Sequence, residues 1–131
     1  MKNSNIYFDS TEIQPHEARV SNILKILPKQ ISNAKKNSPY FKELLANFQP
    51  KQINDITKFS RIPITRKSDL INLQKQSYPL GGLTTCDPGK LKRIFQSPGP
   101  IYDPEGFGSN WWRTARAFHA AGFRKGEIVH N

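Results

Sequence analysis

The sequence predicts an α+β chain, in which N-terminal helices lead into the first short strands and the first helix of an α/β domain. Apolar residues recur at helical spacing near the N-terminus, and short extended runs bounded by proline and glycine follow in the second half. The 131 residues end in a helical pattern, a glycine turn and an extended segment. A helix followed by a strand is how an α/β unit begins, so we expect a truncated unit.

The first expected helix spans about 15–36. Pro15 suits its first position, because the missing N–H of proline has no helical partner there. Pro28 removes an interior hydrogen bond, so we expect a kink or a break at this point. One stripe of the helix holds its apolar residues, at i, i+3, i+4, i+7, i+11 and i+14: Val20, Ile23, Leu24, Leu27, Ile31 and Ala34.

The sequence from residue 38 to residue 79 predicts three short helices. Ser38 and Pro39 are typical of a helix cap and a first turn, and they open the first of the three. Between 52 and 79 two helical pieces flank an extended joint at 61–64. Thr65 is the expected cap of the second piece.

Two short extended segments are expected next. Residues 92–96 are typical of a strand, and 97–100 form a proline-stiffened loop. A second extended piece follows at Ile101 and Tyr102, and 103–110 is expected to be a turn-rich connector.

The last expected helix spans about 111–121, with Ser109 or Asn110 as its cap. Gly122 stands where a left-handed residue commonly ends a helix. The segment 127–130 is expected to begin a strand.

Charge and cysteine usage limit the functional classes. The formal net charge is +10, but nine basic and five acidic residues lie in 1–60 against eleven and five in 61–131, so no basic tail stands out. Cys86 is the lone cysteine, which excludes an internal disulfide, and it has no zinc-ligand spacing to any histidine. We expect it to be partly buried and to have no catalytic role.

Residues 1–10 contain no apolar core of a signal peptide, and no run of about 18 apolar residues occurs. We therefore expect a cytoplasmic protein with no membrane partner.

The segment Arg93–Gly106 is the most informative candidate site. Loops rich in Ser and Gly after a strand often surround a phosphate with N–H groups and hydroxyls. Ser97 and Gly99 are the candidate residues here. Pro98 and Pro100 have no N–H to donate, which favours the alternative of a plain connecting turn. The sequence presents no catalytic residue and no metal site.

A second candidate surface combines aromatic and basic residues near the C-terminus. Such residues can stack on bases and bind phosphates of single-stranded nucleic acid. They fit a packed helix with a solvated basic face better, so the sequence does not favour nucleic acid as a partner. The residues are Trp111, Trp112, Arg113, Arg116 and Arg124.

Four segments carry a family resemblance: Arg61–Leu70, Tyr78–Leu83, Arg93–Ser97 and Ala115–Asn131. In this order and spacing they resemble the N-terminal portion of phenylacetate-CoA ligases, which are adenylate-forming acyl-CoA synthetases. The element Ser38–Phe41 is also similar to an "SPYY" element of that family. The resemblance covers most of the chain.

The resemblance implies two regions: a mainly helical N-terminal region over 1–90, and the incomplete start of an AMP-binding-type α/β domain over 91–131. In the full-length family a small carboxylate and ATP react to an acyl-adenylate, magnesium shields the phosphates, and coenzyme A then displaces AMP. By this resemblance the family's SSGTTGxP-type phosphate loop begins at Ser97 and also matches at Gly99, whereas Pro98, Pro100 and Ile101 depart from its hydroxyl-bearing positions. Its catalytic positions lie beyond this chain, so we predict that the segment alone is inactive and holds no cofactor.

Two other functions stay open. The chain could be a stand-alone helical interaction module that associates with itself or with a separately encoded remainder. It could also be a basic nucleic-acid-binding protein, although the even spread of charge does not favour this. By resemblance, the expected partners are the carboxylate, ATP and CoA, and the acyl group stays undetermined.

Overall fold

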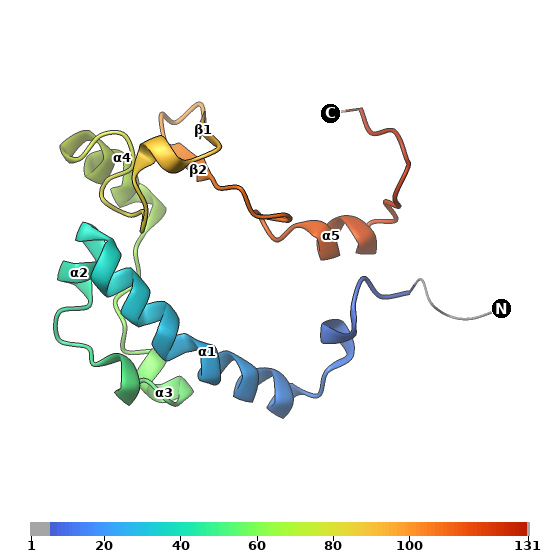
Figure 1. The fold of residues 1–131 in the computed structure, drawn as a ribbon, viewed down its shortest axis with the longest axis horizontal. Helices are drawn as coiled ribbons and strands as arrows, with labels where there is room; N and C mark the ends of the chain where they lie inside the picture. Colours follow the sequence, from blue (N-terminus) through green and yellow to red (C-terminus); the bar gives the residue numbers. More distant parts are fainter. Residues whose placement is uncertain (1–5, 131) are drawn as a thin grey trace.

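The computed structural model describes residues 6–130, and helices precede a small hairpin in it (Figure 1). The predicted α+β class is confirmed. Residues 1–5, which are half of the N-terminal segment expected to lack a signal peptide, and Asn131 lie outside the described residues. The elements are η1 (Ser10–Ile13), α1 (His16–Asn37), α2 (Pro39–Leu44), η2 (Pro50–Gln52), α3 (Ile56–Phe59), α4 (Lys67–Gln76), η3 (Pro88–Lys90), β1 (Arg93–Gln96), β2 (Tyr102–Glu105) and α5 (Ala115–Ala120).

Helix α1 runs through Pro28 as one helix, so the expected break is wrong. An interior proline costs about 3 kcal/mol, but α1 packs against α2 and η2 and buries part of its apolar stripe there. Pro15 precedes the helix as its cap residue and does not open it. The core cluster consists of Ile31, Leu45 and Ile53, with Leu27, Ala34, Phe41, Phe48 and Ile62 packed around it.

Ser38 joins α1 to α2 and is 1% exposed. Its Oγ accepts from the N–H of Phe41 at 3.2 Å, which confirms the predicted cap. The same hydroxyl donates to the carbonyl oxygen of Gly82 at 2.6 Å, and the N–H of Tyr40 donates to that oxygen at 3.2 Å. The start of α2 is thereby fixed to a turn more than forty residues further along the chain.

A non-helical joint separates α3 from α4, but Arg61 and Ile62 form a turn and a bend there, and the cap of α4 differs from the prediction. Arg66 is the cap residue, and its side chain makes no cap hydrogen bond. The hydroxyl of Thr65, the expected cap, instead lies 3.0 Å from the phenol oxygen of Tyr40. A contact between distant segments therefore replaces a local one.

Strands β1 and β2 form an antiparallel hairpin in which Arg93 lies opposite Glu105 and Gln96 opposite Tyr102. The predicted first strand is confirmed. Residues 103–105, expected in a connector, instead extend the second strand because they pair with β1.

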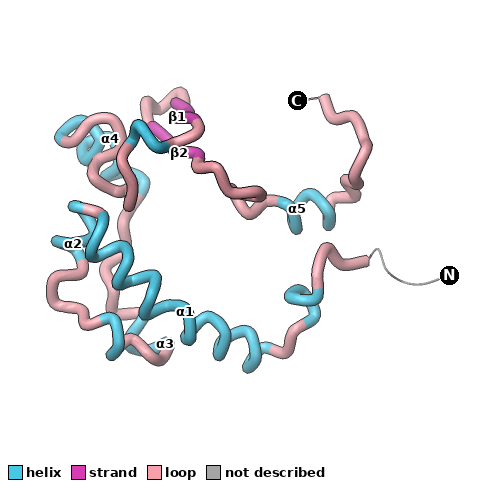
Figure 2. Tube along the Cα trace, in the orientation of Figure 1, coloured by secondary structure: helices cyan, strands magenta, loops and turns pink. Residues whose placement is uncertain are grey.

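Helix α5 is shorter than predicted, because a turn covers 109–112 and residues 113 and 114 have no regular structure (Figure 2). Positive φ angles at Asn110 (52°) and Arg113 (56°) are incompatible with a helix there. The cap residue of α5 is Thr114, whose side chain makes no cap hydrogen bond, so the expected cap at Ser109 or Asn110 is wrong. The Oδ1 of Asn110 still accepts from the N–H of Ala115, at 3.0 Å. The expected strand at 127–130 is wrong, since this segment pairs with no strand among residues 6–130.

The end of α5 follows the prediction. Gly122 has φ 102°, and its N–H donates to the carbonyl of His119 at 3.1 Å. The N–H of Phe123 donates to the carbonyl of Phe118 at 3.0 Å, and the two rings meet edge to face at 5.4 Å. These two hydrogen bonds and the apolar contact make up a Schellman motif.

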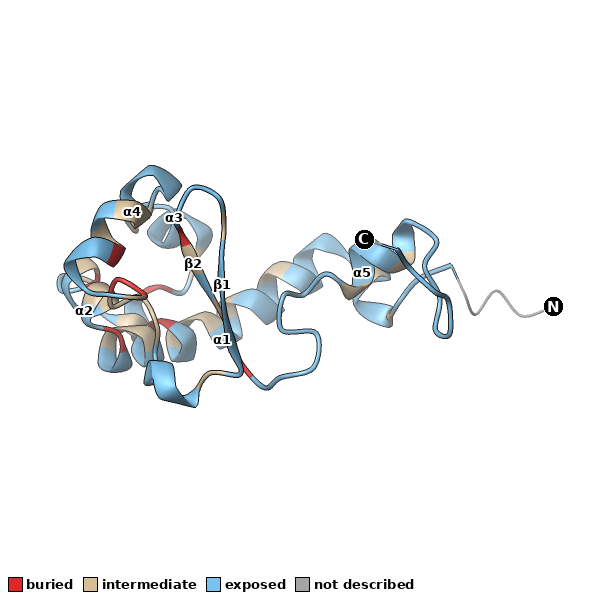
Figure 3. Cartoon of the chain, turned by 90° about the horizontal axis from the view of Figure 1, so that it is seen from above, coloured by how far each residue is buried: buried red, intermediate tan, exposed pale blue. Residues whose placement is uncertain are grey.

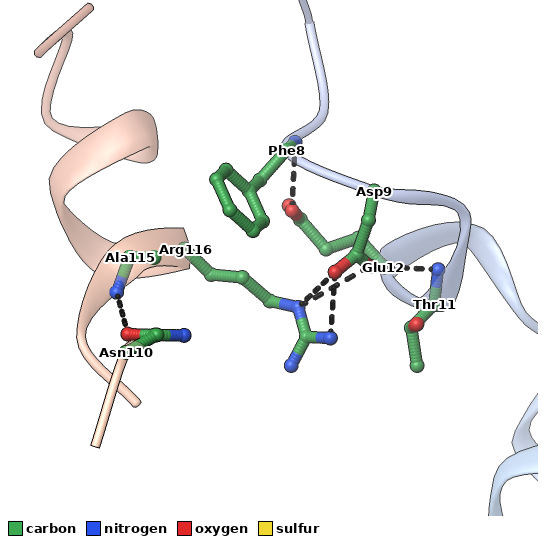
Figure 4. Close-up of polar contacts among 7 residues, drawn as sticks. All are labelled: Phe8, Asp9, Thr11, Glu12, Asn110, Ala115 and Arg116. Carbon is green, nitrogen blue, oxygen red and sulfur yellow. Dashed lines mark hydrogen bonds and ion pairs between the residues drawn. The ribbon is translucent and has the colours of Figure 1, made fainter. Parts of the chain in front are cut away.

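The chain curves so that η1 and α5, distant in sequence, lie side by side (Figure 1). The guanidinium of Arg116 contacts both carboxylate oxygens of Asp9, with its shortest distance 2.8 Å (Figure 4). The rings of Phe8 and His119 meet edge to face at 5.9 Å beside this pair.

Candidate functional site: the hairpin turn and its surroundings

The turn at 97–101 connects β1 to β2. Both the N–H and the hydroxyl of Ser97 donate to the carbonyl oxygen of Ile101, at 2.9 and 3.4 Å. The hydroxyl contact is long, so this group can turn toward a ligand at little cost. Gly99 lies at the exposed tip, where an added Cβ would meet no atom within 4 Å.

This turn has few donors for an anion. Pro98 and Pro100 have no N–H, and the N–H of Ser97 is already used within the turn. The hydroxyl of Ser97 and the N–H of Gly99 are the donors that the two expected residues leave for a phosphate. Two donors can contact one phosphate, but they do not surround a triphosphate.

A small hollow of about 170 Å³ adjoins the turn. Its volume is below the roughly 300–1,000 Å³ of sites that enclose a drug-sized ligand. Lys75 is the one cationic residue among those that line it. The lining residues are Ile71, Gln74, Lys75, Tyr78, Pro100 and Tyr102. The hollow is large enough for a small anion and too small for a whole nucleotide.

Gln74 binds the first residue of β2, directly after the turn, although the sequence did not single it out. Its side-chain amide donates to the carbonyl of Tyr102 at 2.8 Å and accepts from the N–H of Tyr102 at 2.9 Å. The residue is 4% exposed, in a stretch with the partly buried Leu70 and Leu73. A polar residue on the apolar face of a predicted helix is the signal that would have found it.

Glu105 is the second residue that the sequence did not reveal. It is 8% exposed, and Lys92 Nζ lies 3.0 Å from its Oε1 while Arg93 Nε lies 2.9 Å from its Oε2. The hydrogen bonds from Lys92 and then from Arg93 hold the pKa of the Glu105 carboxyl below its usual range, against the opposing effect of burial. Glu105 therefore stays charged and anchors both cations at the start of β1.

The aromatic and basic residues proposed as a nucleic-acid surface are largely engaged within the chain. The indole N–H of Trp111 donates to the carbonyl of Pro104 at 3.0 Å, and its ring lies over Gly106 so closely that a Cβ there would be 2.5 Å away. The rings of Trp112 and Phe95 pack edge to face, with their centroids 6.2 Å apart. Arg116 pairs with Asp9 across the chain.

Metal-ligating side chains do not gather in the part of the chain that the structure describes: no group of three or more His, Cys, Asp or Glu residues occurs there. Cys86 is exposed, against the expectation that it would be partly buried. None of the helices in this range is both long and apolar enough to cross a membrane.

No protein-family model matches the sequence, and no curated protein does. Solved structures of a 2-hydroxyisobutyryl-CoA ligase do match. One, in the postadenylation state with 2-HIB-AMP, is 26% identical with a TM-score of 0.70 over 86% of this chain. An open conformation with 2-HIB-AMP and CoA is 26% identical with a TM-score of 0.71 over 86%. A third, in the thioesterification state, is 23% identical with a TM-score of 0.75 over 96%.

The chain has the fold of the N-terminal portion of an adenylate-forming acyl-CoA ligase. It spans 25–29% of the length of these ligase chains. The resemblance to adenylate-forming synthetases noted in the sequence is thus supported at the level of the superfamily. This ligase-like segment contains the hairpin, α4 and the helical region around Ile31.

Proposed function

We propose that this chain acts as the N-terminal segment of an adenylate-forming acyl-CoA ligase of the phenylacetate-CoA-ligase type. The full-length enzyme would join a small carboxylate, ATP and CoA into an acyl-CoA, with release of AMP and pyrophosphate. The observation that carries the proposal is the match over 86–96% of this chain to ligase structures at TM-scores of 0.70–0.75. The order of the four resembling sequence segments supports the same family.

In this proposal the helical region over 1–90 supports the domain that begins near residue 91. Ser97 and Gly99 contact a phosphate group of ATP through the hydroxyl and the N–H described above. Because the two prolines of the turn have no N–H to donate, the remaining phosphates are left to residues outside this segment. By itself the segment is therefore expected to bind nucleotide weakly and to form no acyl-adenylate.

A chimera tests the role directly. This chain would replace the corresponding segment of the 2-hydroxyisobutyryl-CoA ligase, and ATP–pyrophosphate exchange would be measured with 2-hydroxyisobutyrate and with aryl carboxylates. We expect exchange by the chimera and none by the isolated 131 residues or by the ligase lacking this segment. A chimera that folds but shows no exchange would contradict the proposal, as would exchange by the isolated chain.

The role of the turn is tested within an active chimera. Ser97→Ala removes a hydroxyl that would bond to a charged phosphate, so we expect exchange to fall roughly tenfold to a hundredfold at low ATP. Ser32→Ala, an exposed serine on α1, is the matched control and should leave exchange unchanged. Equal rates for the two variants would remove Ser97 from the phosphate site.

A further inference from the structure

The two edges of the hairpin differ. On the edge of β2 that faces away from β1, the backbone groups of two residues are unable to pair with another strand. Gln74 occupies both the N–H and the carbonyl of Tyr102. Pro104 has no N–H, and its carbonyl accepts from the indole of Trp111 at 3.0 Å. Proline and covering side chains are common means by which proteins keep a sheet edge from pairing with another chain.

The outer edge of β1 is open. In an antiparallel pair, residues opposite each other direct their backbone groups alternately toward and away from the partner strand. The backbone N–H and carbonyl of Tyr102 point away from β1, so those of Gln96, which lies opposite it, point away from β2. The same holds two residues earlier for Ile94, which lies opposite Pro104. Within residues 6–130 no other strand, loop or side chain bonds to these groups. The strand is exposed along its whole length (Figure 3).

The side chains around this edge are apolar and positively charged. Ile94 is 39% exposed and Phe95 is 44% exposed, on opposite faces of the strand. Lys92 and Arg93 share the single carboxylate of Glu105 and keep side-chain exposures of 44% and 56%. Positive charge therefore remains in excess at the start of the strand, in a chain of formal charge +10.

We propose that the open edge of β1 binds an extended acidic segment of another polypeptide, which adds to the hairpin as a third strand. Backbone hydrogen bonds to Ile94 and Gln96 would supply the pairing, and acidic side chains of the added strand would face Lys92 and Arg93. Apolar side chains on its other face would pack on Ile94. This docking site is separate from the proposed phosphate contact at 97–101 and does not depend on it.

Charge favours this partner over a second copy of the chain. Two copies each bring a formal charge of +10, so two chains repel each other as they associate. An acidic strand gains the same backbone hydrogen bonds without that repulsion.

The probe is a short capped peptide in which valine and glutamate alternate, with a valine–lysine peptide of the same length as its control. Peptide binding to the full 131-residue chain is measured by fluorescence anisotropy, and amide hydrogen exchange is followed by NMR. We expect the glutamate peptide to bind at least about tenfold more tightly than the lysine peptide, and more weakly as salt is added. We expect exchange at Ile94 and Gln96 to slow on binding.

Ile94→Pro removes an N–H that points away from β2, so the hairpin keeps its internal pairing while the edge is blocked. Circular dichroism checks that this variant folds. We expect it to bind the glutamate peptide about tenfold more weakly, whereas Ile94→Val, which keeps the N–H, binds as the parent chain does.

Equal binding by Ile94→Pro and Ile94→Val would overturn the proposal. So would equal binding of the two peptides, or slowed exchange confined to residues outside β1. Self-association of the chain that Ile94→Pro abolishes would assign the edge to a second copy instead, and this too would overturn it.

Discussion

Gln74 completes the hydrogen bonding of Tyr102 on the side of β2 that faces away from β1. The amide nitrogen of Gln74 lies 2.8 Å from the Tyr102 carbonyl oxygen, and the Tyr102 nitrogen lies 2.9 Å from the amide oxygen. One side chain thus offers the donor and the acceptor that a neighbouring strand would provide. A two-stranded hairpin is marginally stable by itself, so this contact fixes it to α4.

Replacement of Gln74 by methionine is expected to destabilise the chain by about 2 kcal/mol, because it leaves both backbone groups of Tyr102 without their partner. Urea unfolding followed by circular dichroism measures this difference. Gln76→Met, at an exposed position of the same helix, is the control and should change the free energy of unfolding by less than about 0.5 kcal/mol.

Hydrogen exchange separates this effect from a general loss of packing. In Gln74→Met we expect the N–H of Tyr102 to exchange much faster. The exchange rates of the α1 amides near Ile31 should change only as far as the free energy of unfolding of the whole chain changes. Uniform acceleration across the chain, with no excess at Tyr102, would contradict the local role of Gln74.

Gly81 is expected to tolerate no side chain. Its φ is 64°, and an added Cβ would lie 3.1 Å from the backbone carbon of Leu73 and 3.2 Å from the backbone nitrogen of Gln74. Gly81→Ala should therefore cost about 1–3 kcal/mol in thermal or urea unfolding. Gly99→Ala is the control, because open space surrounds Gly99, and we expect it to be neutral or slightly stabilising. Similar losses for the two variants would argue against this packing.

Local signals accounted for the features that the sequence predicted correctly. The cap Ser38, the turn glycine Gly122 and the apolar stripe that includes Ile31 each depend on residues within a few positions. The strand at 93–96 followed from its bounding turn residues in the same way. Such patterns need no knowledge of the tertiary structure.

The errors arose where a distant partner decides the conformation. Thr65 contacts Tyr40 and does not cap its own helix. Trp111 leaves the expected helix because its indole bonds to Pro104 and its ring covers Gly106. Gln74 acquires its role only when β2 lies beside α4. None of these contacts has a spacing that the sequence alone reveals.

Acid should weaken the start of the hairpin through Glu105. Its pKa is lowered by the hydrogen bonds from Lys92 and Arg93, so its stabilising effect is present above the pKa of an unfolded glutamate, about 4.3. The effect is lost as the pH falls through the lowered pKa of the folded chain.

We therefore expect Glu105→Gln to lower stability near pH 7 and to flatten the decline of stability below about pH 4. Unfolding curves at a series of pH values measure both. Asp103→Asn, on the same strand, removes a carboxylate that contacts no cation among the described residues, and it should keep the acid decline. A decline in Glu105→Gln as steep as in the parent chain would contradict this assignment.

The contact between Asp9 and Arg116 closes the chain across more than a hundred residues, and both side chains are partly exposed (Figure 4). Because exposed ion pairs contribute little to stability, we expect Arg116→Asp to leave the unfolding midpoint nearly unchanged. The variant should instead abolish the NMR cross-peaks between the rings of Phe8 and His119, since two carboxylates would then face each other. Adding Asp9→Arg restores an opposite-charge pair, so the double variant should recover the cross-peaks. Their persistence in Arg116→Asp would mean that the aromatic contact alone holds η1 against α5.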